Sequence, residues 1–271
     1  MVTKEIIKKI KDIEIKSEIL IQEIFTGNYK SSFRGNGIEF EEIREYAEGD
    51  EIRDIDWNVT ARQNRPFVKK YREERELNVF LMVDISKSNR FGKIFEKIAE
   101  ITAVIAVAAS KNRDRVGALF FSDKVEKFIP AKGGKKHALS ILENFFIEGD
   151  MGSTTNLNSA LEYFEKCTKR RSVLFIISDF LTEGYEKTLK RISMKHDVIL
   201  INIKEKAMEK IVKGAIYVLE DLETGEIYEA DTTFSAVNIE NQMAPKHKNL
   251  IKVYSDEDYV KKLKIFFRRR K

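Results

Sequence analysis

The sequence predicts an α/β fold: a doubly wound, mostly parallel sheet flanked by helices and preceded by an irregular, partly helical N-terminal segment. Runs of β-forming residues alternate with longer stretches of helical periodicity, which indicates βαβ units. Two of the runs, residues 79–83 and 173–177, are apolar throughout, as expected of parallel strands that are covered on both faces. Each run ends close to an aspartate, Asp84 and Asp179.

The N-terminal region, residues 1–72, lacks this alternation. Apolar residues in 3–25 have mainly helical spacing, so we expect helical character there with a break in the middle. Residues 27–71 are polar, dense in charge and irregular, apart from a possible strand at 67–71. A long irregular segment is uncommon unless it is functional or lies over a core. We therefore expect residues 1–72 to pack on a domain formed by residues 73–271.

Within residues 73–271, strands and helices follow one another in the order of a doubly wound sheet. We expect strands at residues 79–83, 116–121, 125–129, 172–178 and 198–203. We expect helices at residues 94–112, 137–146, 158–168 and 183–193, and one more near the C-terminus. Residues 216–220 and 227–231 flank a Glu-Thr-Gly turn and are predicted to form a hairpin.

Composition narrows the functional class. The 271 residues are 42% hydrophobic with a formal net charge of +5, which suits one sizeable core and gives no reason to expect nucleic acid as a partner. Cys167 is the only cysteine, so neither an intrachain disulfide nor a thiolate metal cluster is possible. The N-terminus does not resemble a signal peptide, and no run approaches about 20 apolar residues. We expect a cytoplasmic protein with no integral membrane segment.

Three polar loops carry the strongest functional signal. Asp84-Ile85-Ser86-Lys87-Ser88 directly follows an apolar strand, Thr155 lies in a small polar loop before a helix, and Asp179 follows a second apolar strand. Each could be an ordinary turn or helix-cap residue when taken alone. Together they would meet where parallel strands end, which is where open α/β sheets bind ligands. Their carboxylate and hydroxyl oxygens suit a hard divalent cation, Mg²⁺ or Mn²⁺.

The order D-x-S-x-S, Thr, Asp resembles the metal-ion-dependent adhesion site of von Willebrand factor A-like domains. The resemblance implies that Ser86, Ser88 and Thr155 ligate the cation directly, while Asp84 and Asp179 act mostly through water. Thr155 is chosen over Thr154 because it stands five residues before Ala160-Leu161, as the family's threonine does. A departure from the usual pattern is Arg90, which places a positive charge beside the metal loop and would weaken cation binding.

A second resemblance covers nearly the whole chain. The motifs G-x-x-F, R-x-Y-x-x-G-D, R-x-I-D-W and A-R occur in order within residues 37–62, before the A-like domain. They are similar to those of the family called domain of unknown function 58, as are 114–117 (Asp-Arg-Val-Gly) and the Ser178-Asp179-Phe180 motif. Residues 234–254 look shorter than the corresponding family segment. Members of this family look like companions of MoxR-type AAA+ ATPases, so the resemblance implies such an ATPase, or its client, as the partner.

The charged residues of the N-terminal segment allow two interpretations. In the first, alternating arginines and aspartates form salt bridges that hold irregular chain in place, with the tryptophan as an apolar anchor. In the second, the same side chains recognise a partner. The residues concerned are Arg44, Asp50, Arg53, Asp56 and Trp57. Both roles can coexist.

The same sequence argues against most enzyme classes. No phosphate-binding G-x-x-x-x-G-K-[ST] motif occurs, and the three histidines have no paired acid or nucleophile at any motif spacing. A phosphotransferase that used Asp84 as nucleophile would want a carboxylate where Ser86 stands. We expect a non-catalytic module in which the metal grips a carboxylate of a protein partner during complex assembly or remodelling. The alternative is a metal-assisted hydrolase, of the phosphoesterase kind, that uses the same site.

Overall fold

The computed structural model describes most of the chain. The described residues are 16, 18, 39–72, 76–87, 93–147, 154–205, 216–220, 227–231 and 247–270. The chain divides into two compact units, Lys30–Glu76 and the remainder. We name them the small unit and the sheet unit and describe each by itself.

A six-stranded sheet with the order β10-β7-β6-β3-β4-β5 forms the centre of the sheet unit. In chain order its strands are β3 (Asn78–Asp84), β4 (Arg115–Phe121), β5 (Val125–Lys132), β6 (Val173–Ser178), β7 (Asp197–Lys204) and β10 (Leu250–Tyr254). All neighbours are parallel except β4 and β5, which form an antiparallel hairpin. The five parallel strands end at one side of the sheet, which we call the carboxyl edge. The predicted α/β fold with a mostly parallel sheet is confirmed.

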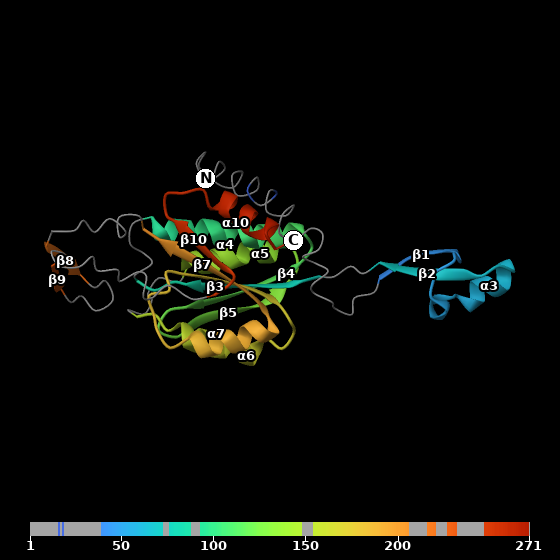
Figure 1. Ribbon diagram of the computed structural model, residues 1–271, viewed down its shortest axis with the longest axis horizontal. Helices are drawn as coiled ribbons and strands as arrows, with labels where there is room; N and C mark the ends of the chain where they lie inside the picture. The colour runs from blue at the N-terminus through green and yellow to red at the C-terminus, as the bar shows by residue number, and fades with distance from the viewer. Residues whose placement is uncertain are drawn as a thin grey trace. The chain divides into compact units, whose positions relative to one another are not determined.

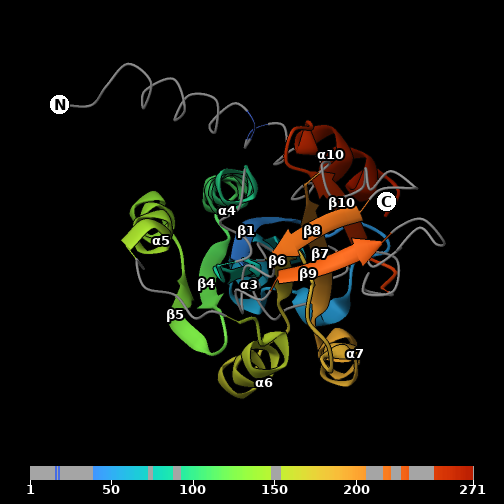
Figure 2. The same cartoon turned by 90° about the vertical axis from the view of Figure 1, so that its left-hand side faces the viewer.

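Helices cover both faces of this sheet (Figures 1 and 2). One face carries α4 (Ile94–Lys111), α5 (Lys135–Ile147) and α10 (Tyr259–Arg268), and the other carries α6 (Leu157–Cys167) and α7 (Glu186–Lys195). Their bounds match the predicted helices to within a few residues. Two further strands, β8 (Ile216–Glu220) and β9 (Ile227–Asp231), pair as the predicted antiparallel hairpin in a sheet of their own.

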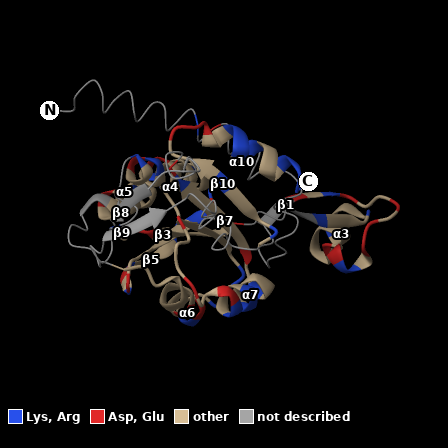
Figure 3. Cartoon of the chain, turned by 60° about the vertical axis from the view of Figure 1, so that its left-hand side comes forward, with Lys and Arg blue, Asp and Glu red and all other residues tan. Residues whose placement is uncertain are grey.

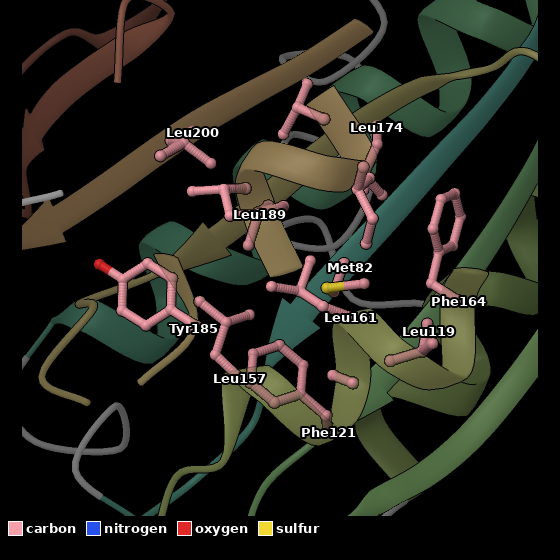
Figure 4. Close-up of a cluster of buried hydrophobic side chains, with 14 of the residues drawn as sticks. Met82, Leu119, Phe121, Leu157, Leu161, Phe164, Leu174, Tyr185, Leu189 and Leu200 are labelled. Carbon is pink, nitrogen blue, oxygen red and sulfur yellow. The ribbon is translucent and has the colours of Figure 1, made fainter. Parts of the chain in front are cut away.

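The core between the sheet and helices α6 and α7 is formed by alternate residues of the strands. Every second residue of each strand points to this face, and the alternate residues that do so are Phe80, Met82, Leu119, Phe121, Leu174, Ile176, Val198 and Leu200. Figure 4 shows how side chains from α6 and α7 close over them. Phe164 of α6 is fully buried, and its ring meets that of Phe80 edge-on at a centroid distance of 5.2 Å. The core thus fixes α6, the helix that starts just after Thr155.

His196 is a buried histidine at the end of α7. It is 3% exposed, its ring lies 5.2 Å from that of Phe164, and neither ring nitrogen has a hydrogen-bond partner among the described residues. Burial, with help from the positive charges of Lys195 and Arg171 and against the effect of Glu165, lowers the pKa of His196 to about 4. The folded chain therefore holds His196 neutral at physiological pH.

Acidification should destabilise the sheet unit through His196. The unfolded chain takes up the proton near pH 6.5, but the folded chain does so only near pH 4, so the free energy of unfolding falls between these values. The fall attributable to His196 should approach about 3 kcal/mol. Urea unfolding at pH 7 and pH 4.5 measures it, and His196→Leu should remove that part of the pH dependence. An unchanged pH profile in His196→Leu would contradict the assignment.

The small unit is more regular than the sequence predicted. Besides the expected strand β2 (Phe67–Arg72), it contains β1 (Glu39–Glu45), a 3-10 turn η1 (Ile52–Asp54) and α3 (Trp57–Gln63). β1 pairs with β2 in an antiparallel sheet. The expectation of an irregular segment is wrong for β1 and α3, because β1 has only two apolar residues and the seven residues of α3 are too few to show a helical period. Residues 27–38 lie outside the described residues.

Of the first 38 residues, the structure describes Lys16 and Glu18, both helical as expected for this segment. Lys16 pairs with Glu100 of α4, and Glu18 pairs with Lys111 at 3.0 Å. The rest of the predicted N-terminal helix lies outside the described residues. None of the helices in the described part of the chain has the length and apolarity needed to cross a membrane.

The basic C-terminus belongs to a capped helix. Asp258 accepts a hydrogen bond from the backbone N–H of Val260 at the start of α10. Lysines and arginines continue along the helix, as Figure 3 shows in blue. Arg270 pairs with Asp197 at 2.7 Å. Acid at the start and base at the end complement the helix dipole, which is the structural interpretation that the sequence favours.

Candidate metal centre

Asp84 is the last residue of β3, and its carboxylate is 1% exposed at the carboxyl edge. One oxygen, Oδ1, accepts a hydrogen bond from the backbone N–H of Ser86 at 3.0 Å. The other, Oδ2, accepts one from Ser178 Oγ at 2.7 Å. These two bonds fix the orientation of the Asp84 carboxylate.

The D-x-S-x-S loop is attached to the neighbouring strand β4. The backbone N–H of Ile85 donates to the carbonyl of Phe121 at 2.9 Å, which extends the β3–β4 ladder by one bond. Ser86 is completely buried. Ser88, the third residue of the motif, and Arg90, the expected source of an opposing charge, lie outside the described residues.

Asp179 directly follows β6, the strand beside β3, and is 8% exposed. Its Oδ1 accepts a hydrogen bond from the backbone N–H of Leu181 at 3.0 Å. The next residue, Phe180, has φ of 58°, a left-handed conformation that is uncommon for a bulky residue. Its N–H donates to Ser178 Oγ at 2.9 Å, and its side chain is fully buried. The buried ring holds this strained turn in place, as is typical of functional loops.

Thr155 lies between these two loops. Its carbonyl accepts a hydrogen bond from Thr182 Oγ1 at 3.0 Å, which ties it to the Asp179 loop. The next N–H along the chain, that of Asn156, donates to the carbonyl of Ser122 at the end of β4, at 2.8 Å. Asn156 also caps α6 by accepting from Ser159 N. Thr155 is half-buried, whereas Thr154 is exposed.

Hydrogen bonds therefore connect all three loops at one place. Ser178 donates a hydrogen bond to Asp84, and Thr182 of the Asp179 loop donates one to the carbonyl of Thr155. The Thr155 loop is hydrogen-bonded to the end of β4, which is in turn hydrogen-bonded to Ile85. The structure thus brings Asp84, Ser86, Thr155 and Asp179 to the same edge of the sheet. This is the convergence that strand order in a doubly wound sheet predicts.

The side chains that converge here fit a hard cation. They supply carboxylate and hydroxyl oxygens, which Mg²⁺ and Mn²⁺ prefer. Within the described ranges, no group of three or more His, Cys, Asp or Glu side chains could hold a metal ion. A cation at the carboxyl edge would therefore depend on serine and threonine hydroxyls beside Asp84 and Asp179.

Ser178 is a site residue that sequence reasoning missed. It is completely buried and contacts Asp84 across the β3–β6 pair, although the two residues are 94 positions apart. Ser122, also fully buried, lies at the same edge, with Oγ 2.6 Å from Glu126 Oε1. A serine at a strand end is too common to single out, so only the register of the strands identifies these two.

Three of the five charged-segment residues hold the small unit together. Arg44 forms two hydrogen bonds to Asp50, at 2.7 and 2.9 Å, and these raise the pKa of Arg44. Asp56 caps α3 through the backbone N–H groups of Asn58 and Val59. The bond from Val59 and the nearby Lys69 lower the pKa of Asp56. These contacts match the structural interpretation.

Arg53 and Trp57 are different, because both side chains are exposed. Trp57 is 67% exposed and nearby Ile52 is 70% exposed, which is unusual for large apolar residues. Arg53 pairs only with its exposed neighbour Glu51 among the contacts described. Trp57 is therefore not buried as an apolar anchor within the small unit itself.

Comparison with known proteins gives one family match. A family model described as "Protein of unknown function DUF58" matches residues 42–249. The uncharacterized protein Rv1480 of Mycobacterium tuberculosis is 28% identical over 227 residues, which cover 81% of this chain and 72% of that protein. The uncharacterized protein YeaD of Bacillus subtilis is 26% identical over 141 residues, 52% of this chain and 34% of that protein.

Among solved structures, the conserved hypothetical protein BatB from Bacteroides thetaiotaomicron superposes with a TM-score of 0.50. The match has 16% sequence identity and covers 71% of this chain and 98% of that chain. At this identity the similarity concerns the fold alone. The sheet unit has the von Willebrand factor A-like fold that the sequence predicts.

Proposed function

The chain belongs to the DUF58 family, and on that premise we propose that it is a non-catalytic protein-interaction module that binds its partner through a divalent cation. The observation that carries the proposal is the Asp84 carboxylate. It is buried at the carboxyl edge, oriented by Ser86 and Ser178, and joined by hydrogen bonds to the loops of Thr155 and Asp179. A buried carboxylate that is held by hydrogen bonds from several loops is typical of a binding site rather than of a turn.

Mg²⁺ or Mn²⁺ is the proposed cation. Ser86, Ser88 and Thr155 would hold it directly, with Asp84 and Asp179 mostly behind water. When bound without a directly coordinated carboxylate of this chain, the cation keeps an electrophilic position that can accept a glutamate or aspartate from the partner. Ser86 is completely buried and Asp84 is 1% exposed, so both side chains are held away from bulk solvent.

A metal-assisted hydrolase is the alternative use of the same site. Such chemistry requires a general base or a second cation near the open position. The expected direct ligands are hydroxyls, and the described ranges contain no group of three or more His, Cys, Asp or Glu side chains that could hold a second cation. The donor set therefore favours binding over hydrolysis.

We propose a MoxR-type AAA+ ATPase, or a client that it remodels, as the partner, and the cytoplasm as the compartment. The support for this partner is the resemblance of the motifs in residues 37–62 to the family. In the small unit, exposed Arg53 and Trp57 are the proposed second contact, while Arg44, Asp50 and Asp56 serve mainly to hold the unit's shape.

Capture of a purified MoxR-type ATPase from the same genome tests the proposal. We expect the immobilised chain to retain the ATPase in Mg²⁺ or Mn²⁺ and to lose at least tenfold of it in EDTA. Asp179→Ala should lose the metal-dependent part, because it removes a carboxylate of the site. Trp57→Ser should weaken capture with unchanged thermal stability, since the side chain is 67% exposed.

Asp56→Ala is the control variant, and two outcomes would contradict the proposal. Asp56→Ala removes a helix cap and should lower the stability of the small unit by about 1 kcal/mol without abolishing metal-dependent capture. Equal capture in Mg²⁺ and EDTA would disprove the metal bridge. Phosphatase or nuclease turnover that disappears in Asp179→Ala would instead favour the hydrolase.

A further inference from the structure

Asn202 continues a row of buried polar side chains across the carboxyl edge. In the register of the sheet, Ser178 of β6 lies opposite Asn202 of β7. On the other side of β6, Val83 pairs with Ile177, which places Asp84 level with Ser178. Asp84, Ser178 and Asn202 are thus neighbours on three adjacent strands.

These three side chains also share one face of the sheet. Along β7, Asn202 alternates in phase with Val198 and Leu200, which point into the core under α6 and α7. In the same way, Asp84 lies two residues after Met82 in β3, and Ser178 lies two residues after Ile176 in β6. The row therefore caps this apolar core at the end where the candidate metal centre lies.

Asn202 lacks partners for both ends of its amide. It is 1% exposed, and neither Nδ2 nor Oδ1 has a hydrogen-bond partner among the described residues. A buried amide without partners is costly, and native proteins rarely keep one without a reason. The residues around it in β7 are Ile201 and Ile203, so an apolar side chain would suit the strand better.

Ser178 offers a place for that amide to act. A serine hydroxyl donates one hydrogen bond and accepts two. Ser178 Oγ donates to Asp84 and accepts from Phe180 N, so its described contacts leave one acceptor position. Adjacent strands are about 4.8 Å apart, a separation at which one water molecule can bridge the amide and the hydroxyl.

We propose that Asn202 is a positioning residue of the candidate metal centre. Its amide donates to Ser178 Oγ through a buried water, and so keeps the Ser178 proton directed at Asp84. With a cation bound, the oriented carboxylate would accept hydrogen bonds from its water ligands. This inference rests on the proposed metal site and adds to it a residue that does not touch the cation.

Mn²⁺ titration by calorimetry at 25 °C tests the role of Asn202. Asn202→Leu keeps the branched shape but removes both polar groups, and it should weaken Mn²⁺ binding about tenfold, the low end for an indirect contact to a metal ligand. Asn202→Ala should weaken Mn²⁺ binding by a similar factor. Because alanine is smaller than asparagine, steric strain cannot explain its effect. Thermal unfolding in EDTA verifies that each variant is folded at the temperature of the titration.

Thr102→Val is the matched control. Thr102 of α4 is also fully buried with a hydroxyl that lacks a partner among the described residues, but its helix lies on the opposite face of the sheet. It should bind Mn²⁺ as the wild type does. Unchanged Mn²⁺ affinity in both Asn202 variants, or an equal loss in Thr102→Val, would overturn the inference while the metal site stands. Absence of Mn²⁺ binding by the wild type would overturn both.

Discussion

Magnesium at a hundred times its dissociation constant should raise the free energy of unfolding of the wild-type chain by about 2.7 kcal/mol, and Asp84→Ala should abolish this gain. A cation that binds only the folded chain stabilises it by mass action. For a chain of this size, the gain corresponds to a rise in melting temperature of roughly 5–10 °C. Thermal unfolding with increasing Mg²⁺, and in EDTA, measures both quantities.

Loss of Asp84 should act on the cation specifically because the carboxylate is 1% exposed and bonded to both Ser86 and Ser178. Asp123→Ala is the matched control, since Asp123 is an exposed carboxylate just beyond the end of β4 at the same edge. It should keep the Mg²⁺-induced stabilisation. An equal shift for wild type and Asp84→Ala would show that Mg²⁺ acts elsewhere, and no shift in the wild type would refute the site.

Phe164→Ala should lower the free energy of unfolding by about 3–5 kcal/mol. The ring is fully buried between α6 and the sheet, where it contacts Phe80 and His196, and its removal leaves a cavity that rigid strands cannot fill. Urea unfolding followed by circular dichroism measures the loss. The neighbouring Tyr163, 39% exposed, gives the control. Tyr163→Ala should cost less than half as much, and equal losses would contradict the packing described for α6.

Much of the fold is predictable because local pattern and tertiary environment agree. Buried parallel strands must be apolar on both faces, and β3 and β6 satisfy this with uninterrupted apolar runs. In the small unit the agreement fails. β1 belongs to a two-stranded sheet, so it needs few apolar residues, and its sequence resembles a loop. α3 begins at a cap, Asp56, whose role becomes visible only when its hydrogen bonds are known.

The candidate site divides in the same way. Asp84, Ser86, Thr155 and Asp179 follow from motif order, because each lies at a strand end or loop that the chain pattern reveals. For Trp57 the sequence allows an apolar anchor or a partner contact, and the structure shows the side chain exposed. Ser178 belongs to a motif, but its contact with Asp84 depends on which strands are neighbours, and the position of Asn202 depends on this alone.

The sequence by itself determined the alternation of strands and helices, and with it a sheet whose polar loops gather at one edge. It also determined the oxygen chemistry of those loops, since residue type sets ligand preference. Only the tertiary structure decided that Ser178 donates to Asp84, that Asn202 lies beside Ser178, and that Trp57 is exposed. The physical reason is that hydrogen bonds between strands and solvent exposure depend on strand order and register, which link residues far apart in the chain and leave no trace in local periodicity.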